Sequence, residues 1–231
     1  MAKKRVTRKQ LIKEPDEFLT FSGRAAHFVR EHSQQFKYLG GAIAAALLIY
    51  LGMSTVMSYV NKKGQKAYNM AYYNLPQDLD VNSESNDLKQ SEELFQKVIN
   101  DYGFSKASRL ALPELAYLKM VEKKYDEAIP LYQEFLQKAS DNMPYQSLAR
   151  MALAACYESK GEFERAIETL MHITAEPDNL FKEQAMLSLA RVYRLADQED
   201  KSEEILKEFT EKFTTSPFHP LAEALLNEPH S

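Results

Sequence analysis

The sequence predicts an all-α protein in which an N-terminal amphipathic helix and a single transmembrane helix precede an α-solenoid of three to four helical hairpins. Three observations support this fold class. Residues 38–61 carry no charged side chain, although 27% of the 231-residue chain is Asp, Glu, Lys or Arg. Apolar residues recur with helical periodicity from there to the C-terminus. Within that part, one pattern of small and large side chains is repeated along the chain.

The first 37 residues form a basic head, with nine Lys and Arg against four Asp and Glu. Its first thirteen residues hold six of these cations and too few apolar side chains to fold alone. Pro15 and Asp16 then signal a helix start, after which apolar residues recur at three- and four-residue steps. We expect an amphipathic helix on a membrane surface, with the basic residues toward anionic lipid. A helix that dimerises or binds a partner is the alternative. The apolar residues are Phe18, Phe21, Ala25, Phe28, Val29 and Phe36.

Residues 38–61 are predicted to form an uncleaved transmembrane anchor. A helix of this length extends about 36 Å, enough to cross a hydrocarbon core of about 30 Å. The apolar run is too long for a cleaved signal peptide and is preceded by too many residues. A buried core helix is the alternative, but no comparably apolar helices follow to surround it. Gly40 with Ala44, and Gly41 with Ala45, have the spacing that lets a second transmembrane helix approach closely.

Charge predicts the orientation of this anchor. The head is basic, whereas the part after the anchor has twenty Lys and Arg against twenty-nine Asp and Glu. Because short cytoplasmic segments are enriched in Lys and Arg, we expect a cytoplasmic N-terminus. Residues 62–231 would then lie in the periplasm, on a single-pass protein of a bacterial inner membrane. Lys62, Lys63 and Lys66 leave the opposite topology, a cytoplasm-facing scaffold, as the alternative.

The part after the anchor consists of repeated helical hairpins. The segments 124–139 and 162–177 align on Ala128 and Ala166, each with an aromatic residue three positions earlier and Ile at the next position. We expect Ala and Ser where two helices cross closely, and larger side chains between hairpins. The aligned small residues Ser91, Ala128, Ala166 and Ser202 are 37, 38 and 36 residues apart. The predicted hairpins are about 62–103, 105–141, 143–177 and 180–215, followed by a capping helix at 218–227.

The segment LARMALAACYESKGEFERAIETLMHITAEPDN, residues 148–179, resembles a tetratricopeptide repeat (TPR). The resemblance implies a protein-binding groove lined by the first helices of the hairpins. The layout of head, anchor and acidic repeat domain is similar to bacterial membrane-anchored TPR proteins of the YfgM type. Those are ancillary to the Sec translocon and associated with periplasmic chaperones. Residues at or beside the TPR signature positions are Leu153, Ala154, Tyr157, Gly161, Phe163, Ala166, Ile173 and Pro177.

No residue pattern indicates an enzyme, a metal site or a cofactor. The five histidines are scattered, and no paired cysteines or glycine-rich phosphate loop occur. Cys156 is the only cysteine, and its apolar neighbours predict a buried thiol. The net acidic repeat domain argues against nucleic acid. The carboxylate pairs Glu92-Glu93, Asp126-Glu127 and Glu203-Glu204 are expected on solvent-facing helical positions.

The expected groove differs from a TPR that clamps a partner's C-terminal carboxylate with Lys, Asn and Arg. In one repeat those places hold Pro113, Glu114 and Tyr117, so the charge clamp is missing. Tyrosine and methionine adapt to varied apolar segments at modest entropic cost. The alternative is that these side chains pack between hairpins. The predicted groove residues are Tyr68, Tyr72, Tyr117, Met120 and Met151, with Arg191 and Arg194 toward one end.

These features predict a non-enzymatic, membrane-anchored scaffold for protein–protein interaction that assists protein translocation or envelope protein assembly. Its expected partners are translocon, chaperone or envelope proteins, and anionic lipid at the basic N-terminus. A purely structural homo-oligomer, built through the anchor and the Phe-rich helix, is the alternative from another class.

Overall fold

The computed structural model describes residues 17–75, 85–138 and 143–228, so the basic tail 1–16 lies outside the described residues. These ranges contain ten helices and no strand, which confirms the predicted all-α class. The chain divides into two compact units, Met1–Val56 and Met57–Ser231.

The first unit contains α2, Glu17–Glu31, and the beginning of α3, Ser33–Tyr73. The helical pattern that was expected to reach Phe36 is interrupted by a turn at His32, so Phe36 belongs to α3. Aromatic contacts bridge this turn: the ring of Phe28 lies 4.4 Å from that of His32 and 6.1 Å from that of Phe36, between centroids. The turn therefore separates the amphipathic segment from the helix that carries the apolar run.

Helix α3 is 41 residues long and, in the part of the chain that the structure describes, is the one helix long and apolar enough to cross a membrane. The whole of its apolar window is exposed, including the consecutive residues 47–51. A core helix of a soluble protein would bury such side chains against neighbours. Helix α3 continues without a break to Ala71, which is fully buried among the first repeat helices.

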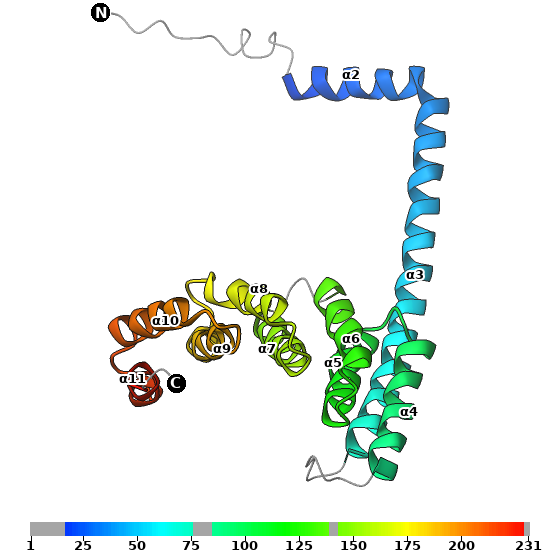
Figure 1. Ribbon diagram of the computed structural model, residues 1–231. Coiled ribbons are helices and arrows are strands. Elements are labelled where there is room, and N and C mark those ends of the chain that lie inside the picture. The colour runs from blue at the N-terminus through cyan, green and yellow to red at the C-terminus, as the bar shows by residue number, and fades with distance from the viewer. Residues whose placement is uncertain (1–16, 76–84, 139–142, 229–231) are drawn as a thin grey trace, which may run out of the picture. The chain divides into compact units, whose positions relative to one another are not determined.

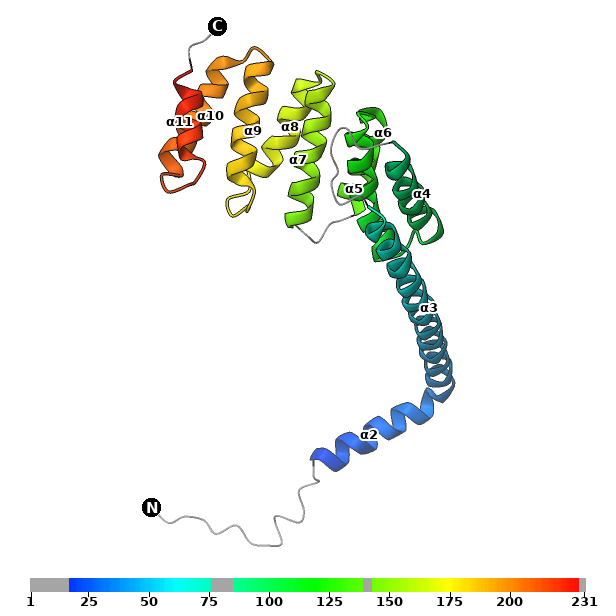
Figure 2. The same cartoon turned by 90° about the horizontal axis from the view of Figure 1, so that it is seen from below.

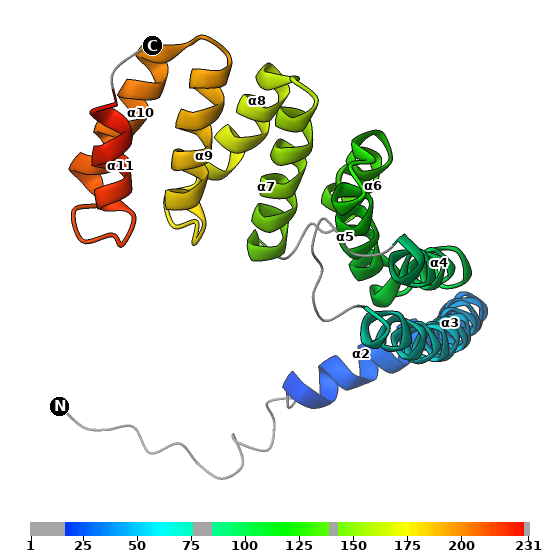
Figure 3. The same cartoon turned by 60° about the horizontal axis from the view of Figure 1, so that its bottom comes forward.

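The second unit is a succession of paired helices (Figures 1 and 2). Neighbouring helices pack against each other along the chain, from α4 with α5 to α10 with α11. In Figure 1, α5, α7, α9 and α11 form one layer and α6, α8 and α10 form the other; Figure 3 brings the first layer forward. The helices are α4 (Ser85–Asp101), α5 (Lys106–Val121), α6 (Tyr125–Lys138), α7 (Met143–Ser159), α8 (Phe163–Thr174), α9 (Lys182–Leu195), α10 (Glu199–Lys212) and α11 (His219–Leu226).

Three hairpins share one turn geometry. Lys123, Gly161 and Asp197 lie in the left-handed region, with φ of 59°, 74° and 56°. In each turn the next amide nitrogen donates to a carbonyl oxygen five residues earlier, as in Lys124 N to Lys119 O at 2.8 Å. This is the hydrogen bond that closes a helix C-terminus around a left-handed residue. Glycine was expected only at the middle turn, yet Lys and Asp adopt the same conformation in the other two.

The aligned small residues occupy the closest helix crossings. Ser91, Ala128, Ala166 and Ser202 are all buried, the last with 2% exposure and the others with none. The hydroxyl of Ser202 donates to the carbonyl oxygen of Ala190 at 2.8 Å, and so satisfies its buried oxygen. Larger side chains such as Tyr132, Phe135 and Leu170 fill the spaces around these crossings. The packing follows the pattern from which the hairpins were predicted.

One carboxylate pair departs from its expected solvent-facing position. The side chain of Glu92 is only 12% exposed, and its Oε2 lies 2.6 Å from Lys119 Nζ on α5. Lys119 also approaches Glu127 Oε2 at 3.2 Å. The prediction was wrong for Glu92 because α4 turns this position toward α5, where burial requires an ionic partner. The neighbouring Glu93 is exposed.

Candidate protein-binding site

A cavity of about 590 Å³ in the repeat domain is lined from α3, α5, α6 and α7. Three of these, α3, α5 and α7, are first helices of their hairpins. Six tyrosines face it, together with apolar residues such as Leu148 and one carboxylate, Glu114. We call it the tyrosine cavity. Its tyrosines are Tyr68, Tyr72 and Tyr73 from α3, Tyr117 from α5, Tyr132 from α6 and Tyr145 from α7.

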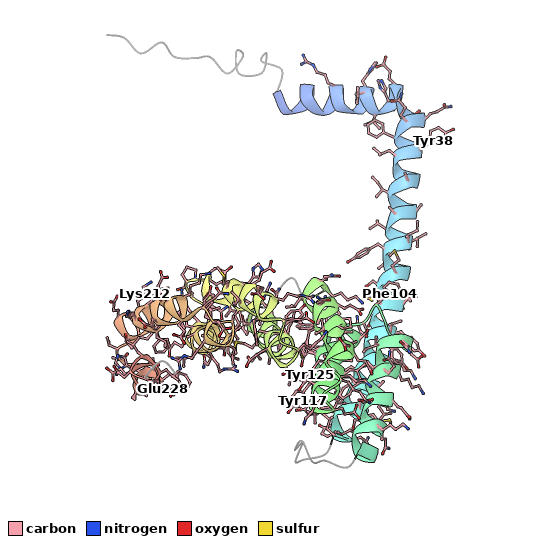
Figure 4. All side chains as sticks on the ribbon, in the orientation of Figure 1. Tyr38, Phe104, Tyr117, Tyr125, Lys212 and Glu228 are labelled. Carbon is pink, nitrogen blue, oxygen red and sulfur yellow. The ribbon has the colours of Figure 1, made fainter. Side chains whose placement is uncertain are left out.

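Helical spacing presents the α3 tyrosines to the cavity as a group. Tyr68 and Tyr72 are four residues apart, on one face of the helix, and their rings stack with centroids 6.1 Å apart. Tyr68 also meets Phe95 of α4 edge-on at 5.7 Å, which fixes its ring against the core. Tyr72 is 51% exposed and Tyr117, which is marked in Figure 4, is 38% exposed. The cavity therefore has a fixed inner wall and an accessible aromatic rim.

Glu114 is the one Asp, Glu, Lys or Arg among the described residues that line the tyrosine cavity. Its Oε1 accepts a hydrogen bond from the hydroxyl of Tyr68 at 3.0 Å. Burial raises the pKa of the Glu114 carboxyl, although the Tyr68 hydrogen bond acts in the opposite direction. Burial and the charge of Glu114 also raise the pKa of Tyr68 far above its ordinary range. Burial thus raises the pKa of both members of this hydrogen-bonded pair, the Glu114 carboxyl and the Tyr68 hydroxyl.

The predicted groove residues do not form one surface. Tyr68, Tyr72 and Tyr117 line the tyrosine cavity. Met120 and Met151 are half-buried and pack against the main hydrophobic core, outside the cavity lining. Position along a first helix therefore did not distinguish groove side chains from those between hairpins.

Arg191 and Arg194 lie at a second cavity, of about 320 Å³, formed by α9, α10 and α11. Arg191 pairs with Glu158 of α7. Arg194 contacts Glu228 Oε2 at 2.7 Å and donates to the carbonyl oxygen of Leu225 at 2.8 Å. Both arginines thus have acceptors within the chain, and Arg194 holds the segment around the last helix in place.

The small residues of the apolar run lie on α3 outside the repeat domain. Gly40, Gly41, Ala44 and Ala45 are exposed, and an added Cβ at either glycine would meet no atom within 4 Å. This stripe has room for another helix, and its role in transmembrane packing stays a prediction.

Chemistry that would indicate catalysis is missing from the described ranges. No group of three or more His, Cys, Asp or Glu among them could hold a metal ion. Cys156 is fully buried, and burial raises its thiol pKa to about 11. A thiol in that environment is protonated at neutral pH and does not act as a nucleophile. Sequence reasoning gave Glu114 no role, although a carboxylate within the apolar helix segment ALPELAYL was the signal that could have found it.

Paired helices that stack in two layers and cross at buried small residues define an α-solenoid of helical hairpins, a class that binds proteins. The chain belongs to the tetratricopeptide repeat-like domain family, whose sequence profile matches residues 32–185. This fold is typically a non-catalytic scaffold for protein interaction.

Solved structures show the same fold. The kinesin light chain nearly identical TPR-like repeats of Podosopora anserina superpose with a TM-score of 0.54 at 17% identity, covering 70% of this chain and 82% of that chain. A single-substitution variant of that protein gives the same values. No curated protein sequence matches the chain.

Proposed function

We propose that the protein is a single-pass, membrane-anchored TPR scaffold that binds other proteins and has no enzymatic activity. The observation that carries this proposal is the continuity of α3, whose exposed apolar run leads within one helix to Ala71 in the core of the first repeat. An exposed apolar helix of this length is stable in lipid rather than in water. The repeat domain that follows belongs to a family of interaction modules.

The proposal includes the orientation and the compartment. The basic head favours a cytoplasmic N-terminus, and the acidic repeat domain is then periplasmic, at a bacterial inner membrane. This layout resembles proteins of the YfgM type, so the scaffold would assist protein translocation or envelope protein assembly. Translocon, chaperone or envelope proteins are the proposed partners, and the basic tail would bind anionic lipid.

A topology reporter tests the orientation. A reporter that is active only in the periplasm is fused after Ser231, and the fusion is checked for membrane insertion at full length. We expect an active reporter. An inserted protein with an inactive reporter would support the cytoplasm-facing scaffold instead.

Partner capture in intact membranes tests the binding function. The full-length protein is crosslinked in its membrane, purified, and its partners are identified by mass spectrometry. Replacing Tyr72 and Tyr117 together by Ala should reduce the recovery of those partners, because both side chains lie exposed at the cavity rim. Leu180→Ala is the matched control, since Leu180 is 78% exposed but lies outside the cavity. Crosslinks to other copies alone, lost when Gly41 and Ala45 become Leu, would favour the structural homo-oligomer.

A further inference from the structure

Among the described residues, the lining of the tyrosine cavity contains one acidic side chain, Glu114, and no Lys, Arg or His. Within the same residues, Glu114 has Tyr68 as its one hydrogen-bond partner. Removing a carboxylate from water without a cationic partner is unfavourable. Elsewhere the chain does provide such a partner, as Lys119 does for Glu92 at 2.6 Å. The isolated carboxylate is therefore a feature of the cavity that folding alone does not explain.

The rings around Glu114 suit a cation as well. Tyrosine faces attract cations, most strongly when water is excluded from the contact. The chain contains a formed example of this chemistry outside the cavity. There the guanidinium of Arg165 lies 4.2 Å from the ring centroid of Tyr157 and donates to its hydroxyl at 2.9 Å, while its other end pairs with Glu162 at 2.5 Å. In this protein, one carboxylate and one tyrosine thus contact the same guanidinium.

We propose that the tyrosine cavity binds the cationic side chain of an arginine or lysine presented by an extended segment of a partner protein. The cation pairs with the free oxygen of Glu114, and its flat or aliphatic part packs against Tyr72 and Tyr117. A volume of about 590 Å³ accommodates such a side chain with its neighbours, and lies within the range of roughly 300–1,000 Å³ usual for ligand sites. The charges are the reverse of those in a TPR that binds a partner's carboxylate with cationic side chains, because here the groove supplies the carboxylate and the partner supplies the cation.

This inference deepens the proposed function and rests on it, because the cation is part of a protein partner. The net negative charge of the domain favours approach of a basic segment. The apolar lining would bind the residues on either side of the cation.

Two synthetic peptides test the inference with the full-length protein in nanodiscs. Both are acetyl-Ser-Leu-Ala-X-Leu-Ala-Ser-amide; X is arginine in one and citrulline, its neutral isostere, in the other. We expect the arginine peptide to bind about ten-fold more tightly by isothermal titration, as for a charge-assisted hydrogen bond in a partly desolvated site. Glu114→Gln should remove most of this ten-fold preference, leaving the smaller cation–π contribution, and should not change the affinity of the citrulline peptide.

Two further variants give controls. Tyr72→Leu keeps an apolar side chain at an exposed position and should weaken the arginine peptide about three-fold by removing one cation–π face. Glu164→Gln removes an exposed carboxylate of α8, outside the cavity, and should change neither affinity.

Equal affinity of the two peptides, no binding of either, or a ten-fold preference for the arginine peptide that is undiminished in Glu114→Gln would overturn the inference. Each of these results leaves the proposed function standing if membrane crosslinking still yields partners that depend on Tyr72 and Tyr117. The proposed function itself would be contradicted if the wild-type protein crosslinked to no partner protein.

A second, independent observation concerns the turn between α4 and α5. The turn packs on α3 at the end of the uncharged run 38–61: Asn61 Oδ1 accepts a hydrogen bond from Lys106 N at 3.0 Å. A Cβ on Gly64 would lie 2.7 Å from Ser105 Oγ, so glycine is needed for this close approach. Phe104, at the tip of the turn, is 90% exposed and is marked beside α3 in Figure 4.

Phe104 therefore lies beside the end of the apolar run. Three exposed cations occur in the same part of the structure: Lys62, Lys63 and Lys106. Lys63 Nζ lies 5.7 Å from the ring centroid of Tyr59. Aromatic and basic side chains gather in this way where a protein meets the boundary of a bilayer. We infer that Phe104 inserts into the lipid headgroup region and fixes the first repeat to the membrane surface beside α3.

The absence of tryptophan from the sequence gives a direct test. Phe104→Trp is reconstituted at full length in vesicles of phosphatidylglycerol and phosphatidylcholine with brominated acyl chains, which quench tryptophan fluorescence in contact with lipid. We expect blue-shifted emission and loss of most of the signal. Tyr50→Trp, within the apolar run, should also be quenched, and Leu180→Trp, exposed between α8 and α9, should not be.

Quenching of Phe104→Trp no stronger than that of Leu180→Trp, with Tyr50→Trp quenched, would overturn this inference alone. If Tyr50→Trp were not quenched, the result would contradict the proposed membrane anchor and therefore also the lipid contact of Phe104.

Discussion

Two partly buried carboxylates at opposite faces of α5 have different partners. On the outer face, Glu92 of α4 is paired with Lys119 of α5 at 2.6 Å, and Glu127 of α6 adds a further contact. On the face toward the tyrosine cavity, the one described hydrogen-bond partner of Glu114 is the hydroxyl of Tyr68, at 3.0 Å. Burial raises the pKa of both carboxyl groups, but only the outer one has a cation to oppose that effect. The two sites therefore differ in whether the fold itself supplies a cation to the carboxylate.

The outer pair should give the largest effect on stability. Lys119→Met removes the cation and leaves Glu92 in a site where its side chain is 12% exposed. Breaking a buried pair leaves an uncompensated charge, so we expect the free energy of unfolding to fall by about 2 kcal/mol, measured by urea denaturation of the full-length protein in detergent. The double variant Lys119→Met with Glu92→Gln should recover part of this loss. A cost below about 0.5 kcal/mol would place the pair among exposed ion pairs.

The inner carboxylate should give an effect of the opposite sign. Glu114→Gln keeps the shape of the side chain and an oxygen that accepts from Tyr68, while it removes the unpaired charge. In the absence of partner we expect the free energy of unfolding at pH 7 to rise by about 1 kcal/mol. Destabilisation of similar size would show that the Glu114 charge contributes to the fold, and would contradict its role as a site for a cation.

The pH dependence of the free energy of unfolding should differ between the wild-type protein and Glu114→Gln. The folded chain binds the Glu114 proton more tightly than the unfolded chain, in which the pKa is near 4.5. Wild-type stability therefore falls, relative to Glu114→Gln, as pH rises from about 4.5 through the raised pKa of the folded state. Among the described residues, the other titratable groups that line the cavity from α3, α5, α6 and α7 are tyrosines. Parallel stability curves from pH 4 to 7 would contradict the unpaired buried charge.

The arginines of the second cavity should give the smallest effect. Arg191 is 55% exposed and pairs with Glu158. Exposed pairs contribute little, so Arg191→Gln should change the free energy of unfolding by less than about 0.5 kcal/mol. Nor should it alter the affinity of the arginine peptide, because its charge is already paired and lies outside the tyrosine cavity. A marked change in peptide affinity would indicate that the second cavity also contributes to peptide binding.

The repeated architecture was predictable because close helix crossings admit only small side chains. Ala128 and Ala166 are fully buried for that reason, and their spacing carried the prediction of helical hairpins. The apolar run was equally clear, since residues 38–61 contain no charge. The turn at His32 was not predictable from periodicity, because the backbone hydrogen bond from Phe36 N to His32 O continues the helical pattern across it.

The site was harder to predict than the fold. Tyr72 and Met151 occur on first helices with similar periodicity, yet Tyr72 lies at the cavity rim and Met151 packs into the core. Which of them faces the cavity depends on how neighbouring hairpins pack, and a single-helix pattern does not contain that information. Glu92 and Glu114 illustrate the same limit, since only the packed structure shows which carboxylate meets a lysine.

The most direct test of a cation-binding protein scaffold is site-specific photocrosslinking at Tyr72 in the full-length protein, in its own membrane. A photoreactive phenylalanine analogue at this position should crosslink to partner segments that contain arginine or lysine. The same crosslinks should be lost in Glu114→Gln but retained in Glu164→Gln. Crosslinked segments without basic residues, or crosslinks that survive Glu114→Gln unchanged, would contradict the assignment of the tyrosine cavity.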